Sequence, residues 1–281
     1  MGKQPEYITS RQNSLLVLTE KLTDRKHRRR EGLFRFDGRK LFTEALQTEV
    51  ELFALLLRES NAEEFLTIAR SAHLSDSCRI VILPDALFDR ISEENAPEGV
   101  ICVAKYLDKL HEIVTINKGN DAAKVLLPGR TLILESVRDP GNLGTIIRSA
   151  RAFGVANLLL SADCADIYHP RTLRAAMGTL FSQHILVTED VVGAVRALGE
   201  ERRVFAAALD VRAARLGSVA FSESDIAVIG NEGHGLSAAL LDACTHSIYI
   251  PMNEGVESLN ASIAASVLLW EMYRGGVCNT N

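Results

Sequence analysis

The second half of the chain alternates short apolar runs with amphipathic stretches. The apolar runs have the length of buried strands, and they cover residues 131–135, 156–161, 184–187, 204–208, 225–230 and 246–250. Helical patterns fill the intervals, at residues 143–153, 170–179, 191–198, 236–242 and 260–273. Strands that alternate with helices predict a parallel sheet covered on both faces, and hence an α/β fold.

The first hundred residues predict a smaller α/β unit. Leu15, Leu18 and Leu22 fall at helical spacing and predict one helix over residues 12–28. Further strands are expected at residues 32–36, 50–57, 79–83 and 100–104, and further helices at residues 38–47 and 62–72. The pattern is mixed after residue 106 and ends in a Pro-Gly pair. We therefore predict a domain at residues 1–110, a linker at 111–128 and a second domain at 129–281.

Composition favours a folded, cytoplasmic protein. The chain has 281 residues, of which 47% are hydrophobic and 24% charged, so each half can bury a core. No apolar run is long enough to span a bilayer, and the first residues do not resemble a secretory signal, so no membrane partner is expected. The five cysteines include no CxxC pair and the seven histidines no HxxxH pattern, so we expect no metal site.

Positive charge is concentrated near the N-terminus. The net charge is −5, yet residues 1–40 alone carry +6. Arg28, Arg29 and Arg30 could therefore bind RNA phosphates. Their position at the end of a predicted helix also suits the helix dipole, and this alternative stays open. Phe34 and Phe36 follow this segment and could stack on bases, although a core role is favoured for both.

Three polar segments follow predicted strands of the second half. The first is the turn Asp139–Asn142, in which we expect Asn142 to be the N-cap of the next helix. The second, Gly230–Ser237, has three glycines, but their spacing fits neither a dinucleotide fingerprint nor a Walker loop. The third, Ile250–Ser262, leads into a helix of small residues. Ligands bind at the carboxyl ends of parallel strands, so one composite site is expected.

These segments carry a family resemblance. The patterns that carry it are Asn142-x-Gly144-x-x-x-Arg148, Gly230-x-Glu232-x-x-Gly235-Leu236-Ser237, and Ile250-Pro251-Met252 with Ser258-Leu259-Asn260-x-Ser262. In order and spacing they resemble the three motifs of the SpoU/TrmH methyltransferases, and the likeness covers about residues 130–275. The first domain is similar, more loosely, to a ribosomal-protein-like substrate-binding domain, on Ile8–Asn13, Arg28–Phe34 and Asp37-Gly38-x-x-Leu41.

The resemblance implies a C-terminal trefoil-knotted parallel-sheet methyltransferase domain preceded by a small ribosomal-protein-like α/β domain. It further implies a homodimer that uses S-adenosyl-L-methionine to methylate a ribose 2′-hydroxyl of RNA. Ribosomal RNA is favoured over transfer RNA because of the first domain. A transfer-RNA ribose methyltransferase, a related base methyltransferase and a catalytically silent RNA-binding or assembly factor remain alternatives.

The resemblance also assigns site residues. It implies catalytic roles for Asn142, Arg148, Glu232, Ser258 and Asn260, and cofactor-binding roles for Gly230, Asn231, Ile250, Met252 and Leu259. Arginine stays protonated in proteins, so we expect Arg148 to hold a phosphate or stabilise a developing alkoxide rather than to act as a base.

Overall fold

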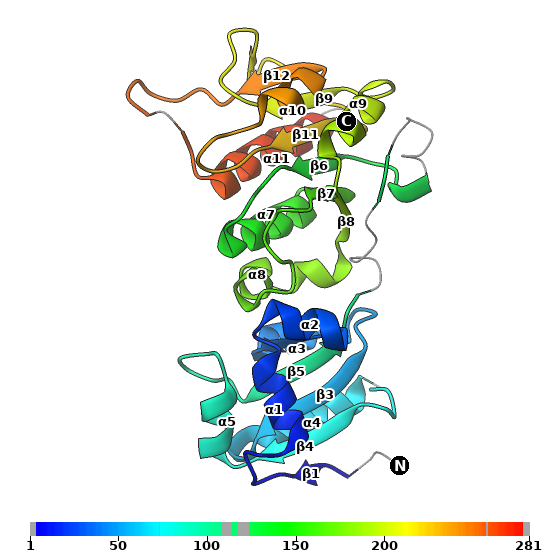
Figure 1. Cartoon of the computed structure of the whole chain (residues 1–281), viewed down its shortest axis with the longest axis vertical. Coiled ribbons are helices and arrows are strands. Elements are labelled where there is room, and N and C mark those ends of the chain that lie inside the picture. The colour runs from blue at the N-terminus through cyan, green and yellow to red at the C-terminus, as the bar shows by residue number, and fades with distance from the viewer. Residues whose placement is uncertain (1–3, 73, 108–113, 117–123, 257, 278–281) are drawn as a thin grey trace. The chain divides into compact units, whose positions relative to one another are not determined.

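The computed structural model describes residues 4–72, 74–107, 114–116, 124–256 and 258–277 (Figure 1). The chain forms two compact units. The first comprises Met1–Leu107 with Tyr168–Ser182, and the second comprises Asp108–Ile167 with Gln183–Asn281. Within the predicted linker, residues 111–113 and 117–123 lie outside the described residues.

The N-terminal unit contains a five-stranded mixed sheet. Its strands are β1 (Glu6–Tyr7), β2 (Leu33–Asp37), β3 (Leu52–Arg58), β4 (Arg79–Leu83) and β5 (Val100–Lys105), in the order β1-β4-β3-β5-β2. Around it lie α3 (Arg39–Leu46), η1 (Glu59–Asn61), α4 (Ala62–Ser71) and α5 (Asp85–Ile91). The four predicted strands and the helices corresponding to α3 and α4 are confirmed, whereas β1 and α5 were not predicted.

The predicted helix over residues 12–28 is wrong as a single element. The chain forms α1 (Ser14–Lys21) and α2 (Arg25–Glu31), separated by a turn. Asp24 causes the break, because its side chain accepts a hydrogen bond from the backbone N–H of Lys26 at 2.6 Å and so caps a new helix. Gly32 then ends α2 with a left-handed conformation, φ 64°.

An aromatic cluster packs on β2 within this unit. Phe34 and Phe36 are buried, which confirms their favoured core role. Their ring partners include Tyr168, 4.6 Å from Phe34, and Phe181, 5.2 Å from Phe36. These partners come from the segment Tyr168–Ser182, which contains α8 (Pro170–Ala176) and η3 (Thr179–Ser182). The hydrophobic core of the N-terminal unit is therefore completed by a segment from the second half of the chain.

The C-terminal unit contains a seven-stranded sheet in which every strand pair is parallel, as predicted. Its order is β10-β12-β9-β11-β6-β7-β8. The strands are β6 (Thr131–Leu134), β7 (Asn157–Ser161), β8 (His184–Thr188), β9 (Val204–Ala207), β10 (Ala214–Arg215), β11 (Ile226–Ile229) and β12 (His246–Tyr249). Six match the predicted runs, and the two-residue β10 was not expected.

Helices cover both faces of this sheet. On one face α9 (Val191–Gly199) and α10 (Ala238–Ala243) enclose a core that includes Ile133, Leu159 and Val228. Successive side chains of a strand alternate between faces. The intervening residues therefore point to the other face, where α7 (Pro140–Ala152) and α11 (Ala261–Val277) lie side by side (Figure 1). Because all strands run in parallel, the loops that follow β6, β7, β11 and β12 meet at one edge.

Candidate active site

The loop between β11 and α10 is a tight hairpin. Asn231 and Gly235 exchange two backbone hydrogen bonds, each of 3.0 Å. A side chain at Gly230 would overlap the backbone of Gly235 and Leu236, so only glycine fits there. The glycine-rich segment Gly230–Ser237 thus brings its own backbone into close contact and forms one wall of a cavity.

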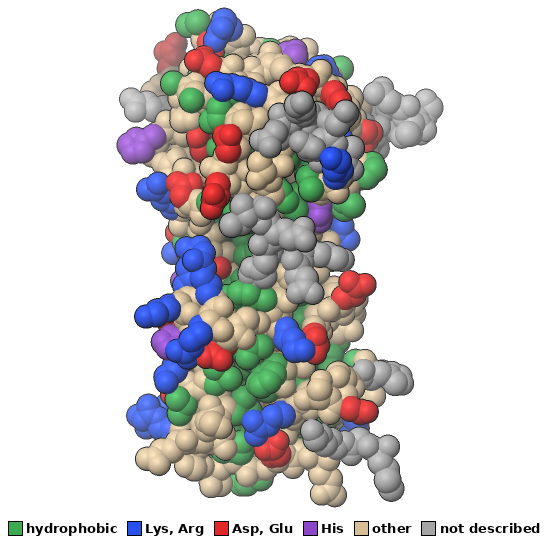
Figure 2. Space-filling model, turned by 45° about the vertical axis from the view of Figure 1, so that its right-hand side comes forward, with side chains coloured by type: hydrophobic (Ala, Val, Ile, Leu, Met, Phe, Trp, Pro, Cys, Tyr) green, Lys and Arg blue, Asp and Glu red, His purple; other side chains and the backbone are tan. Residues whose placement is uncertain are grey.

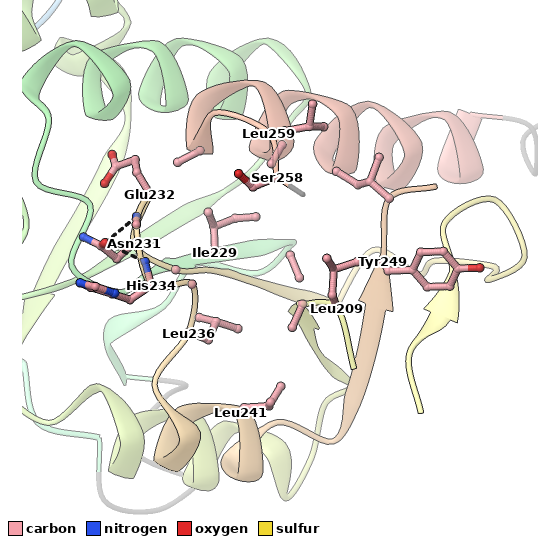
Figure 3. A pocket seen from close by; sticks show the side chains of 18 of the residues that line it. Leu209, Ile229, Asn231, Glu232, His234, Leu236, Leu241, Tyr249, Ser258 and Leu259 are labelled. Carbon is pink, nitrogen blue, oxygen red and sulfur yellow. Dashed lines mark hydrogen bonds between the residues drawn. The ribbon is translucent and has the colours of Figure 1, made fainter. Parts of the chain in front are cut away.

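This cavity has a volume of about 520 Å³, within the range of roughly 300–1,000 Å³ that small-molecule sites occupy. Figure 3 shows Asn231, Glu232 and His234 at one end of it and Leu209 and Tyr249 at the other. All five residues predicted to bind a cofactor line this one cavity: Gly230, Asn231, Ile250, Met252 and Leu259. Glu232 and Ser258 line it as well.

Glu232 also belongs to a chain of hydrogen bonds that leaves the cavity. The amide nitrogen of Asn142 donates to Glu232 Oε1 at 3.0 Å. The amide oxygen of Asn142 accepts from Asn260 Nδ2, also at 3.0 Å. Asn260 Oδ1 in turn accepts from the backbone N–H and the hydroxyl of Ser262 at 2.9 and 2.6 Å. Asn142 and Asn260, which are 118 positions apart in the sequence, are joined in this way.

The start of α11 determines which amide atoms donate and which accept along this chain of hydrogen bonds. Asn260 Oδ1 faces backbone N–H donors at the helix N-terminus, so its Nδ2 must point to Asn142. Asn142 must then accept on its oxygen and donate with its nitrogen to the Glu232 carboxylate. Each amide therefore has one orientation, which ends in a charge-assisted hydrogen bond at the cavity wall.

The prediction that Asn142 caps α7 is wrong. Asp139 is the N-cap, and its side chain accepts from the backbone N–H of Asn142 at 2.8 Å, with Pro140 in the first turn. Asn142 lies within the helix instead. Its side chain is therefore available for Glu232 and Asn260.

Arg148 and Ser258 stand apart from the hydrogen-bond chain. Arg148 lies on α7 with an exposed side chain, and no hydrogen bond or ion pair joins it to the other predicted site residues within the described residues. Its neighbour Ser149 contacts the Ser266 hydroxyl on α11 at 2.7 Å, which fixes this turn of α7 against α11. Ser258 is exposed at the cavity rim. Their catalytic roles stay predictions.

Sequence reasoning missed a polar cluster beside the glycine-rich loop. Asp163 accepts hydrogen bonds from the hydroxyls of Ser136 and Ser161, both at 2.6 Å, and from Arg138 at 2.9 Å. Partial burial raises the pKa of Asp163, but these hydrogen bonds outweigh it and lower that pKa to about 2. The signal was present in the sequence, because Asp163 follows the β7 strand at the same sheet edge as the other site loops.

The three arginines predicted to bind RNA differ in exposure. Arg28 is 1% exposed, and its Nη1 donates to the carbonyls of Leu22 and Thr23 at 2.8 and 2.7 Å. A guanidinium buried in this way cannot also hold a phosphate, so the structure limits the RNA-binding prediction to Arg29 and Arg30, which are exposed. On the face of the N-terminal unit that Figure 2 shows, Lys and Arg side chains gather along one side.

Two features are absent from the described part of the chain. No group of three or more His, Cys, Asp or Glu side chains there could hold a metal ion. None of the helices described is both long and apolar enough to cross a membrane.

Comparisons with known proteins agree with the motifs. The model of the SpoU rRNA methylase family matches residues 129–270, and the model of the MRM3-like substrate binding domain matches residues 16–102. A Bacillus subtilis protein named 23S rRNA (guanosine(2553)-2′-O)-methyltransferase is 28% identical over 267 residues, 94% of this chain and 98% of that protein. A Streptomyces viridochromogenes protein named 23S rRNA (uridine(2479)-2′-O)-methyltransferase is 31% identical over 202 residues, 70% of this chain and 67% of that protein.

A solved structure has the same architecture over nearly the whole chain. The S-adenosylmethionine-bound rRNA methyltransferase from Sinorhizobium meliloti superposes with a TM-score of 0.79 at 26% identity, covering 97% of this chain and 98% of that one. The motifs, the parallel sheet with its site loops at one edge and the match over residues 129–270 lead to one conclusion. The chain belongs to the SpoU rRNA methylase family.

Proposed function

We propose that this protein transfers a methyl group from S-adenosylmethionine to a ribose 2′-hydroxyl of ribosomal RNA. One observation carries the proposal: Glu232 lines the cavity and also ends the hydrogen-bond chain through Asn142 and Asn260. A cofactor site and a polar catalytic site thus share one carboxylate. The relatives named as 23S rRNA 2′-O-methyltransferases, which span both units of this chain, support ribosomal RNA as the substrate.

The cavity fits the proposed cofactor. Its walls are apolar at Leu209, Ile229 and Leu259, while glycines of the hairpin, which carry no side chain, form another part of the lining. We propose that Gly230, Asn231, Ile250, Met252 and Leu259 hold S-adenosylmethionine. When bound, the cofactor supplies the methyl group as an electrophile on its sulfonium sulfur.

The protein's own residues would place the hydroxyl and stabilise charge. The oriented amides of Asn142 and Asn260 and the carboxylate of Glu232 would position the ribose, since a weak nucleophile gains most from being held in place. Ser258, at the cavity rim, would contribute a further hydrogen bond. Arg148 has an exposed guanidinium that would bind a substrate phosphate or the developing alkoxide.

The family resemblance also suggests a homodimer, and one face of α11 supports it. Ile263, Val267 and Trp270 follow one another at helical spacing and are 53%, 38% and 51% exposed. Exposed large apolar side chains in a row are typical of a protein interface. We propose that this face of α11 binds a second copy of the chain. By the same resemblance we propose a trefoil knot in the C-terminal unit. A cytoplasmic location is proposed from the composition and the scattered cysteines.

Alkaline hydrolysis tests the proposed reaction directly. A free 2′-hydroxyl attacks its neighbouring phosphate in alkali, and a methyl group on that oxygen prevents the attack. Ribosomal RNA incubated with the protein and S-adenosylmethionine should acquire one alkali-resistant linkage. Labelled methyl groups in fully cleavable RNA would instead indicate base methylation, and no incorporation into any RNA would favour the silent RNA-binding alternative.

A matched pair of variants isolates the role of Arg148. Arg148→Ala should lower methyl transfer by about a hundredfold to a thousandfold, the usual cost of removing charge stabilisation at a reacting centre. Arg151→Ala removes another exposed arginine from the last turn of the same helix and should leave transfer near the wild-type rate. Equal rates for both variants would make Arg148 an ordinary surface residue.

A further inference from the structure

Ser136 has an unusual backbone at the carboxyl end of β6. Its φ is 55°, one of two positive values among the non-glycine residues described. A residue with a side chain adopts this left-handed conformation at an energetic cost, so surrounding contacts must hold it there. The side chain and the backbone of Ser136 are both held from the end of the neighbouring strand β7.

Asp163 is the centre of that restraint. The Ser136 hydroxyl donates to Asp163 Oδ2, while the Ser161 hydroxyl donates to Asp163 Oδ1. Ser161 Oγ also accepts from the backbone N–H of Ser136 at 2.9 Å. One carboxylate thus fixes Ser136 directly and also fixes the serine that binds its backbone. The ion pair between Asp163 and Arg138 adds less, because the Arg138 side chain is 69% exposed and solvent screens the charges.

The restrained residue holds the glycine-rich loop. The left-handed turn at Ser136 leaves its carbonyl to accept from Asn231 Nδ2 at 2.8 Å. Asn231 Oδ1 accepts from the backbone N–H groups of Gly233 and His234 at 2.8 and 3.3 Å. Both ends of the Asn231 amide are therefore used within the protein. Its side chain shapes the hairpin that forms the cavity wall.

We propose that Asp163 is a positioning residue for the cofactor loop, acting through Ser136 and Asn231. The inference rests on the proposed function, since it concerns the loop that would hold S-adenosylmethionine. Asp163 is not among the residues that line the cavity, and its carboxylate is bound to serine and arginine side chains. It fixes the shape of the site from the next loop along the same sheet edge.

The sheet offers a matched control for a test of this role. Asp225 also accepts from an arginine, Arg203, at 3.0 and 2.6 Å, and from the hydroxyl and backbone N–H of a serine, Ser222. It precedes β11, however, and so lies at the amino ends of the strands, opposite the cavity. Asp225→Asn should therefore lower stability without changing cofactor affinity.

The experiment measures S-adenosylmethionine binding to the full-length chain by calorimetry, together with the thermal unfolding midpoint. Asp163→Asn should raise the cofactor Kd about tenfold, because an amide cannot accept both serine hydroxyls and the arginine. A rise of threefold or less would overturn the proposal, and so would an equal rise in Asp225→Asn. If Asp163→Asn does not fold, Ser136→Ala replaces it in the test. A rise in its cofactor Kd of threefold or less would then overturn the proposal.

A second arm tests the route through Ser136. Glycine adopts positive φ without strain, so Ser136→Gly removes both the hydroxyl and the need to restrain the backbone. In that background Asp163→Asn should raise Kd by much less than in the wild-type background. Equal effects in the two backgrounds would refute the route. Absence of S-adenosylmethionine binding by the wild type would instead count against the proposed function itself.

Discussion

Replacing Asn142 by aspartate should make catalysis depend on pH in a way that wild-type catalysis does not. The change is isosteric and keeps the acceptor for Asn260 Nδ2, but it turns the donor that faces Glu232 into a second carboxylate. Asn142 Nδ2 and Glu232 Oε1 are 3.0 Å apart. Two like charges at this distance repel by about 5 kcal/mol at an effective dielectric constant near 20, and solvent reduces this at a half-buried site.

The carboxylate pair lowers this repulsion by binding a shared proton. One member of such a pair holds its proton to higher pH than an isolated carboxyl group. In the protonated pair, an O–H group again donates to Glu232. The hydrogen-bond chain through Asn260 then regains its orientation. Asn142→Asp should therefore lose activity at high pH and recover part of it as the pH falls.

The assay is the rate of methyl transfer to ribosomal RNA at a series of pH values from about 8 down to about 5, compared with the wild-type rate at each pH. The loss at high pH should be about tenfold to a hundredfold, which corresponds to the roughly 1.5–3 kcal/mol of a hydrogen bond to a charged group. Asn142→Ala serves as the control, with a loss that does not change with pH. A constant ratio of wild-type to Asn142→Asp rates would refute the reasoning.

Other variants probe the cavity wall, the exposed arginines, the apolar face of α11 and Asp163. Gly230→Ala should weaken S-adenosylmethionine binding about tenfold to a hundredfold in calorimetry, because its Cβ would overlap the opposite arm of the hairpin; unchanged affinity would contradict the site. Neutralising Arg29 and Arg30 together should reduce the slope of log binding constant against log salt concentration by about 1.4, because each single-stranded phosphate contact contributes roughly 0.7 to that slope. An unchanged slope would contradict RNA contact by these two arginines. Trp270→Glu should shift the mass measured by light scattering from that of two chains to that of one. An unchanged dimer would exclude the apolar face of α11 as the dimer interface. The pKa of Asp163 is lowered from 3.8 to about 2, so the stability that wild type has over Asp163→Asn in urea titrations should be complete above pH 3.8 and disappear as the pH falls through 2.

The strands and most helices could be predicted because their signals are local. Apolar runs identified β6, β7 and β11 within one or two residues, since a parallel strand buried on both faces is a nearly continuous apolar run. The error at residues 12–28 has a local cause as well. Leucine spacing continues as far as Leu22, which lies in the turn, but Asp24 then caps a new helix instead of continuing the first one.

The site could be predicted in outline only. Parallel strands bring their carboxyl ends together, so the meeting of the three motif loops follows from the fold class. Which amide faces which partner depends on tertiary packing, and Asn142 could be linked to Asn260 only once α7 lay against α11. The burial of Arg28 and the left-handed conformation of Ser136 depend on contacts between segments, and no spacing rule encodes them.

The aromatic cluster on β2 affects how this chain can be divided or recombined. Tyr168 and Phe181 belong by sequence to the methylase match, yet they complete the core around Phe34 and Phe36. A fragment starting at residue 129 would expose these rings to water and should aggregate, while a fragment ending at residue 107 would lack part of its own interior. Chimeras between relatives should therefore fold only when the segment Tyr168–Ser182 is exchanged together with the N-terminal unit.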